Sequence, residues 1–122
     1  LLFRNHREAP ALFKYNDRYY LITSGCTGWA PNRAELHVAK NLFGPWKSLG
    51  DPMRGPNSAL TFDGQSTFVL PVAGKKDSFI FMADRWKPKE LMDSRYIWLP
   101  IDLRHEKVQI NWRDQWDLSV FH

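Results

Sequence analysis

Short runs of apolar and aromatic residues, separated by turn residues, recur along the whole chain, and helical periodicity is poor throughout. This pattern is typical of an all-β protein. Asn16 and Asp17 both tolerate a positive φ angle, so they predict a tight hairpin between the first two runs. In all, the pattern predicts eight strands, at residues 11–15, 18–24, 35–39, 46–49, 66–72, 78–83, 96–103 and 108–112.

The second half of this pattern repeats the first. The aromatic and aliphatic run at residues 19–22 corresponds to the run at residues 79–82, 60 residues later. A propeller blade is a four-stranded antiparallel sheet that buries both faces, so two such meanders indicate two consecutive blades. We expect one blade in residues 1–64 and another in residues 65–122. Two blades cannot close a ring, so we interpret the chain as part of a larger propeller, with a two-sheet sandwich as the alternative.

Composition and charge narrow the function classes. The chain has 122 residues and a net charge of +4 that is scattered rather than gathered in runs, which does not favour nucleic acid as a partner. No stretch approaches the roughly 18 to 20 apolar residues of a membrane span. One cysteine and four histidines without ligand-like spacing predict no metal site, and nothing in the pattern indicates a cofactor.

Glu8 is the first candidate for chemistry. It stands just before a strand-entry proline, Pro10, where the chain of a propeller would run along the central axis. A glutamate before a strand is most often solvated. However, residues 11–13 are apolar, and a carboxyl held against apolar walls has its neutral form favoured, as a general acid requires.

Residues 24–29 form the second candidate segment, which ends the next predicted strand with small residues followed by Trp29. Glycines let a backbone approach a ligand closely, and the face of a tryptophan stacks well on the apolar face of a sugar. This segment therefore has the features of a sugar contact. The alternative is a wide turn with Trp29 packed beneath it.

Five motifs follow one another along the chain: residues 7–14 (REAPALFK), 19–29 (YYLITSGCTGW), 44–46 (GPW), 65–69 (QSTFV), and 82–86 (MADRW) with 93–96 (DSRY). In this order they resemble the motifs of glycoside hydrolase family 43, and the similarity covers nearly the whole chain. The exo-β-1,3-galactanase-like branch is the most similar. The resemblance implies a five-bladed β-propeller, metal-independent hydrolysis with inversion at the anomeric carbon, a pocket at the propeller axis, and an extracellular or periplasmic location.

The resemblance also implies roles for two residues. Glu8 matches the general acid of the family, which protonates the leaving glycosidic oxygen. Gln65 matches a position at which the galactanase-like branch has glutamine in place of the usual base. A neutral amide is a very poor proton acceptor, so Gln65 could act only by orienting water or through its rare imidic-acid tautomer. The aspartates that complete the site elsewhere in the family would come from blades outside this chain.

Four further residues are candidates for substrate binding. Thr27 and Trp29 fall where the family lines the pocket beside the acid. Asp84 ends a strand at the same end of the second blade as residue 24 does in the first, and Arg95 follows nearby. The alternative for Asp84 is an ion pair with Arg85 or Arg95 that fixes the loop.

The sequence therefore predicts the acid-bearing part of an inverting exo-hydrolase of β-1,3-galactan. Its partners would be an oligosaccharide or polysaccharide and the remaining blades of the same protein, with no nucleic acid, membrane or cofactor. Two alternatives stay open at this point. One is a family 43 arabinofuranosidase or xylosidase, and the other is a propeller that binds glycans without hydrolysing them.

Overall fold

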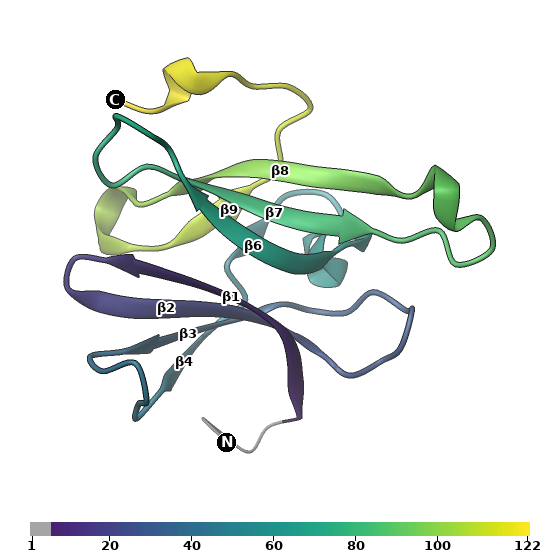
Figure 1. Cartoon of the computed structure of the whole chain (residues 1–122), viewed down its shortest axis with the longest axis horizontal. Coiled ribbons are helices and arrows are strands. Elements are labelled where there is room, and N and C mark those ends of the chain that lie inside the picture. The colour runs from purple at the N-terminus through teal and green to yellow at the C-terminus, as the bar shows by residue number, and fades with distance from the viewer. Residues whose placement is uncertain (1–5) are drawn as a thin grey trace.

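The computed structural model describes residues 6–122 and consists almost entirely of strands (Figure 1). Residues 1–5 of the first expected blade lie outside the described residues. The tight hairpin is confirmed, because Asn16 and Asp17 have φ angles of 50° and 56°. The first sheet is an antiparallel meander of β1 (Arg7–Tyr15), β2 (Arg18–Gly25), β3 (Glu35–Ala39) and β4 (Lys47–Gly50), in that order.

The second sheet repeats this meander and gains one strand that the sequence pattern missed. β5 (Met53–Arg54) is two residues long and pairs in parallel with β9 (Gln109–Asn111), where the buried Met53 lies opposite Ile110. β5 therefore belongs to the first expected blade in sequence but to the second sheet in space. The strand order is β5 (Met53–Arg54), β9 (Gln109–Asn111), β8 (Arg95–Asp102), β7 (Phe79–Arg85) and β6 (Gln65–Pro71).

The helices of the described residues are four short 3₁₀ segments in the connections, and none has the length and hydropathy needed to cross a membrane. The longest of them precedes β6, where the chain passes from one sheet to the next. The four segments are η1 (Ser58–Asp63), η2 (Leu91–Asp93), η3 (Arg104–Glu106) and η4 (Leu118–Val120).

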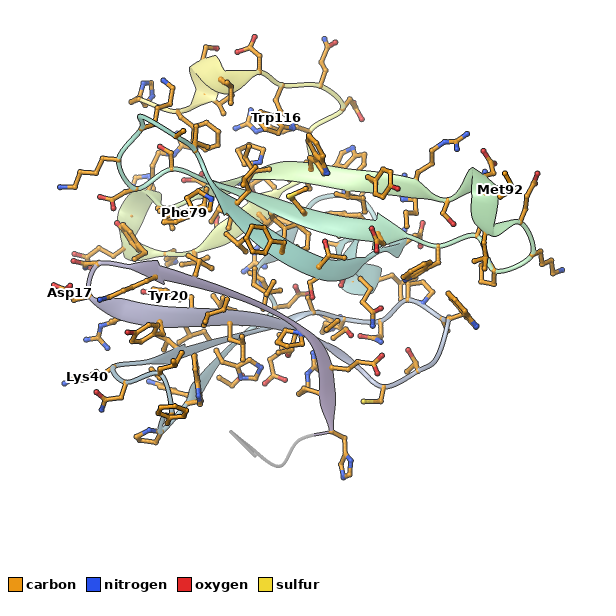
Figure 2. All side chains as sticks on the ribbon, viewed as in Figure 1. Asp17, Tyr20, Lys40, Phe79, Met92 and Trp116 are labelled. Carbon is orange, nitrogen blue, oxygen red and sulfur yellow. The ribbon has the colours of Figure 1, made fainter. Side chains whose placement is uncertain are left out.

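The two sheets pack face to face, and β1 and β6, the first strand of each meander, lie against one another (Figure 1). Aromatic side chains of both sheets, among them Tyr20 and Phe79, lie at one end of this interface (Figure 2). The ring of Phe13 stacks on Tyr20 and contacts Phe79, and the centroids are 5.2 Å apart in both pairs. Burial of this apolar surface is the main source of stability for the pair of sheets. The core includes Ala11, Ile22, Leu36, Met53, Phe62, Val69, Phe81, Ala83, Ile97, Leu99 and Ile110.

The opposite face of the second sheet is apolar but exposed. The strand register places Phe68, Met82 and Trp98 side by side on this face, with Tyr96 two residues further along β8. Phe68 and Trp98 are 52% and 53% exposed, and Tyr96 is 74% exposed. Contiguous apolar surface of this kind is typical of a face that packs against another element.

We predict that residues 1–122, expressed alone, associate through this face. Size-exclusion chromatography should show dimers or larger species, and the Phe68→Ser/Trp98→Ser double variant should raise the monomer fraction. The matched control is Phe43→Ser/Leu91→Ser, which removes two exposed apolar side chains from turns elsewhere and should leave the elution profile unchanged. A monodisperse, cooperatively melting monomer of the unmodified chain would contradict this prediction.

Candidate active site

The start of β1 departs from regular strand geometry at Ala9. The register between β1 and β2 shifts between Glu8 and Ala11, and Ala9 has a φ angle of 53°. A bulge of this kind changes the direction in which the neighbouring side chains point. As a result Glu8 lies directly opposite Ser24 at the end of β2.

Glu8 and Ser24 are both bound by Gln65, the first residue of β6. The Gln65 amide nitrogen donates to Glu8 Oε1 at 2.9 Å and to Ser24 Oγ at 2.9 Å. An amide nitrogen carries two hydrogens, so these two bonds use its full donor capacity and leave Gln65 Oε1 for other partners. The two candidate residues thus come together at the same end of the two sheets. Ser24 begins the second candidate segment, residues 24–29, but the sequence predicted no site role for it.

Gln65 contacts Glu8 directly in this structure, and its expected role in orienting the attacking water stays a prediction. In an inverting glycosidase the acid and the water-activating group are about 6.5 to 9.5 Å apart, because the sugar and the water lie between them. The 2.9 Å contact between the Glu8 carboxyl and the Gln65 amide is shorter than this separation. The physical reason is that β1 and β6 are neighbouring strands, and residues 8 and 65 occupy equivalent positions at their starts.

Arg7 fixes the beginning of β1 from the opposite face of the sheet. Its guanidinium donates to Thr23 Oγ1 at 2.9 Å and to the Thr23 carbonyl at 3.0 Å, and lies 3.5 Å from a carboxylate oxygen of Glu35. The Thr23 hydroxyl also lies 3.0 Å from Nε2 of the buried His37. Burial lowers the pKa of His37, which keeps the ring neutral near pH 7.

The loop after β2 is held by side-chain hydrogen bonds that include Thr27. The Thr27 hydroxyl donates to the Ala30 carbonyl at 2.6 Å and accepts from Asn32 Nδ2 at 2.7 Å. Asn32 in turn bonds both backbone polar groups of Gly25 at 2.8 and 3.0 Å. In this structure, therefore, Thr27 shapes the loop that carries Trp29, with its hydroxyl occupied by loop partners.

Trp29 and Trp86 form an aromatic wall from the two sheets. Their rings are perpendicular, with centroids 5.1 Å apart and an interplanar angle of 78°. Trp29 is 55% exposed, so it is not packed beneath the turn. A narrow hollow beside the two rings is also lined by Ser24 and Gln65, which connects the aromatic wall to the Glu8 cluster. Sequence reasoning missed Trp86, although it follows the end of β7 as Trp29 follows the end of β2.

Asp84 lies at the same end of the second sheet, directly opposite Gln65 in the strand register. It is half-buried, and among residues 6–122 it has no ion pair with Arg85 or Arg95. Arg85 instead donates to the Phe62 carbonyl at 2.8 and 3.1 Å. The contact of Asp84 with the substrate stays a prediction.

Arg95 is held by a different carboxylate, that of Asp93, at 2.5 Å. Asp93 also pairs with Lys87 across the base of the loop, and the Lys87 ammonium together with the Arg95 guanidinium lowers the pKa of Asp93. Both ion pairs are largely exposed. Arg95 thus braces the loop that follows Trp86, and the structure does not bring it into the Glu8 cluster.

Within the part of the chain that the structure describes, no group of three or more His, Cys, Asp or Glu side chains could hold a metal ion. The site consists of the Glu8 carboxyl bound by the Gln65 amide, which also binds the Ser24 hydroxyl, next to the indole rings of Trp29 and Trp86.

Solved structures with the same fold identify the family. A β-1,3-galactosidase of glycoside hydrolase family 43, solved with galactodeoxynojirimycin, is 50% identical over 93% of this chain with a TM-score of 0.89. The chain belongs to glycoside hydrolase family 43. A second family 43 β-1,3-galactosidase is 39% identical over 94% of the chain, with a TM-score of 0.90. No family model matches the chain, and a search of curated proteins finds no match.

An exo-β-1,3-galactanase from Phanerochaete chrysosporium, solved with β-1,3-galactotriose, is 39% identical over 86% of the chain with a TM-score of 0.76. The family 43 neighbours are five-bladed β-propellers, which confirms the expected fold class and excludes the two-sheet sandwich. The chain spans 33%, 24% and 23% of the lengths of these three structures. It therefore corresponds to only part of the propeller.

Proposed function

We propose that the whole protein containing this chain is an exo-acting glycoside hydrolase that releases galactose from β-1,3-linked galactan with inversion, and that Glu8 is its general acid. The observation that carries the proposal is the position of Glu8, which Gln65 holds at 2.9 Å beside a hollow walled by Trp29 and Trp86. The similarity to enzymes named for β-1,3-galactan and solved with galactose-type ligands supports the same substrate class.

The proposed reaction uses the residues as follows. Glu8 transfers its proton to the glycosidic oxygen while the bond between that oxygen and the anomeric carbon breaks. A water on the other face of the sugar forms the new bond to carbon, and its proton passes to a base that the rest of the protein supplies. Gln65 keeps Glu8 aimed at the leaving oxygen, and the Ser24 hydroxyl holds the Gln65 amide in place. The indole rings of Trp29 and Trp86 would pack against the apolar face of the sugar.

Other parts of the proposal follow from the family. The substrate is a neutral polysaccharide, so recognition needs aromatic faces and hydrogen-bonding groups rather than a strongly charged surface. An extracellular or periplasmic location fits such a substrate and stays a prediction, as does packing against the remaining blades. Greater activity on aryl arabinofuranosides or xylosides than on galactan would move the substrate assignment to the other branch of the family.

Glu8→Gln in the whole protein keeps the size of the side chain but removes the transferable proton. We expect kcat on β-1,3-galactan to fall by about 10² to 10⁴, and to fall much less on an aryl β-galactoside whose leaving group needs little protonation. Glu106→Gln, in an exposed 3₁₀ turn, is the control and should leave both rates unchanged. Equal losses on both substrates, or no loss, would remove Glu8 from the role of acid.

Gln65→Ala separates the two possible roles of Gln65. If Gln65 holds the acid, as the contact indicates, the variant should resemble Glu8→Gln and lose more activity on galactan than on the activated aryl galactoside. If Gln65 instead orients the water, both substrates should be affected alike. Initial rates on the two substrates, measured side by side, give the ratio that decides between these roles.

Trp29→Ala should weaken binding of galactose or β-1,3-galactobiose by about 1 to 3 kcal/mol, because it removes one ring of the aromatic wall. Trp86→Ala should have an effect of similar sign, since each ring packs against the other. Isothermal titration calorimetry measures both. Unchanged affinity in both variants would show that the sugar does not lie on this wall.

A further inference from the structure

Two hydrogen bonds join consecutive residues of β1 to consecutive residues of β6. Gln65 Nε2 donates to the Glu8 side chain at 2.9 Å, and the Ser66 hydroxyl donates to the carbonyl of Ala9 at 2.6 Å. The peptide bonds between Glu8 and Ala9 and between Gln65 and Ser66 complete a closed ring of contacts through these four residues. Ser66 is 4% exposed, so its hydroxyl is shielded from water and bonded only inside the protein.

The carbonyl that Ser66 binds belongs to a residue with a strained backbone conformation. Ala9 has a φ angle of 53°, in the left-handed region that an alanine rarely adopts because its Cβ crowds the following carbonyl. Such a conformation persists only where surrounding contacts determine it. Pro10 fixes the backbone on one side, and the Ser66 hydroxyl fixes the carbonyl itself.

β6 has a register shift of its own at the same place, between Ser66 and Phe68. The two strands thus leave regular geometry where they are joined. A buried polar group that lost its partner here would carry a desolvation cost, so the Ser66 bond and the bulge at Ala9 are expected to form together.

We propose that Ser66 is a positioning residue for Glu8, acting through the Ala9 carbonyl. The Ser66 hydroxyl does not touch Glu8. It holds the Ala9–Pro10 peptide, and through the positive φ of Ala9 this sets the backbone direction at Glu8 and directs the carboxyl to Gln65. The expected loss of catalysis on replacing Ser66 rests on the proposed function, whereas the expected displacement of the Glu8 carboxyl does not.

The kinetic test compares Ser66→Ala, Ser66→Thr and Ser78→Ala in the whole protein. Ser78 is the matched control, because it is 5% exposed and its hydroxyl donates to a carbonyl, that of Lys76, at 3.0 Å in a turn at the opposite end of β7. We expect Ser66→Ala to lower kcat on β-1,3-galactan by about 10- to 100-fold with KM nearly unchanged, because the acid is misaligned.

The loss in Ser66→Ala should be smaller on an activated aryl galactoside, and Ser66→Thr, which keeps the hydroxyl, should restore most of the rate. Ser78→Ala should lower Tm by a similar amount without changing kcat. The proposal would be overturned if Ser66→Ala and Ser78→Ala had the same kcat on galactan and the same ratio of rates on galactan and the aryl galactoside.

Ala9→Gly provides a second test that does not lower stability. Glycine adopts a positive φ as readily as a negative one, so the strain is relieved while the local chain becomes freer. We expect Tm to stay near that of the unmodified protein and kcat on galactan to fall. An unchanged kcat would show that the geometry of this bulge does not position the acid.

A crystal structure of the Ser66→Ala protein tests the same claim without any activity. The distance between Glu8 Oε1 and Gln65 Nε2 should exceed hydrogen-bond range, whereas retention of the 2.9 Å contact would overturn the proposal. If the unmodified protein neither hydrolyses galactan nor binds galactose, the proposed function fails, and this structure still decides the role of Ser66.

Discussion

The hydrogen bond between the Gln65 amide and the Glu8 carboxyl, at 2.9 Å, is the contact on which the candidate site depends. It joins two residues that are 57 positions apart and belong to different sheets. Its length is set by the packing of β1 against β6, and that packing is set by the apolar core between the sheets. The hydrophobic pattern of the strands therefore determines where the acid lies, although none of the core side chains takes part in the chemistry.

The strands and their order could be predicted because apolar alternation and turn residues are local signals, but the register at the site could not. Counting back from the hairpin at Asn16 and Asp17 places Ala9 opposite Ser24. The structure places Glu8 there instead, since the bulge shifts the register by one residue. An alanine with positive φ has no sequence signal, because its conformation is imposed by Pro10 and by Ser66 from the other sheet.

The remaining differences have separate causes. β5 is too short for any periodicity and is defined by pairing of Met53 with Ile110. Trp86 could have been found from its position after β7, which parallels that of Trp29 after β2. Arg95 pairs with Asp93 rather than with Asp84, because Asp93 is only two residues away along the chain. The roles of Glu8 and Gln65 came from resemblance to the family, and their mutual contact came only from the fold.

The account is tested most directly by a crystal structure of the whole protein carrying Glu8→Gln, with β-1,3-galactotriose bound. It predicts the glycosidic oxygen within about 3.2 Å of the residue 8 side chain, with Gln65 on that same side of the sugar and still bonded to residue 8. A complex in which the sugar separates the two side chains, so that Gln65 faces the anomeric carbon from the opposite side, would contradict it.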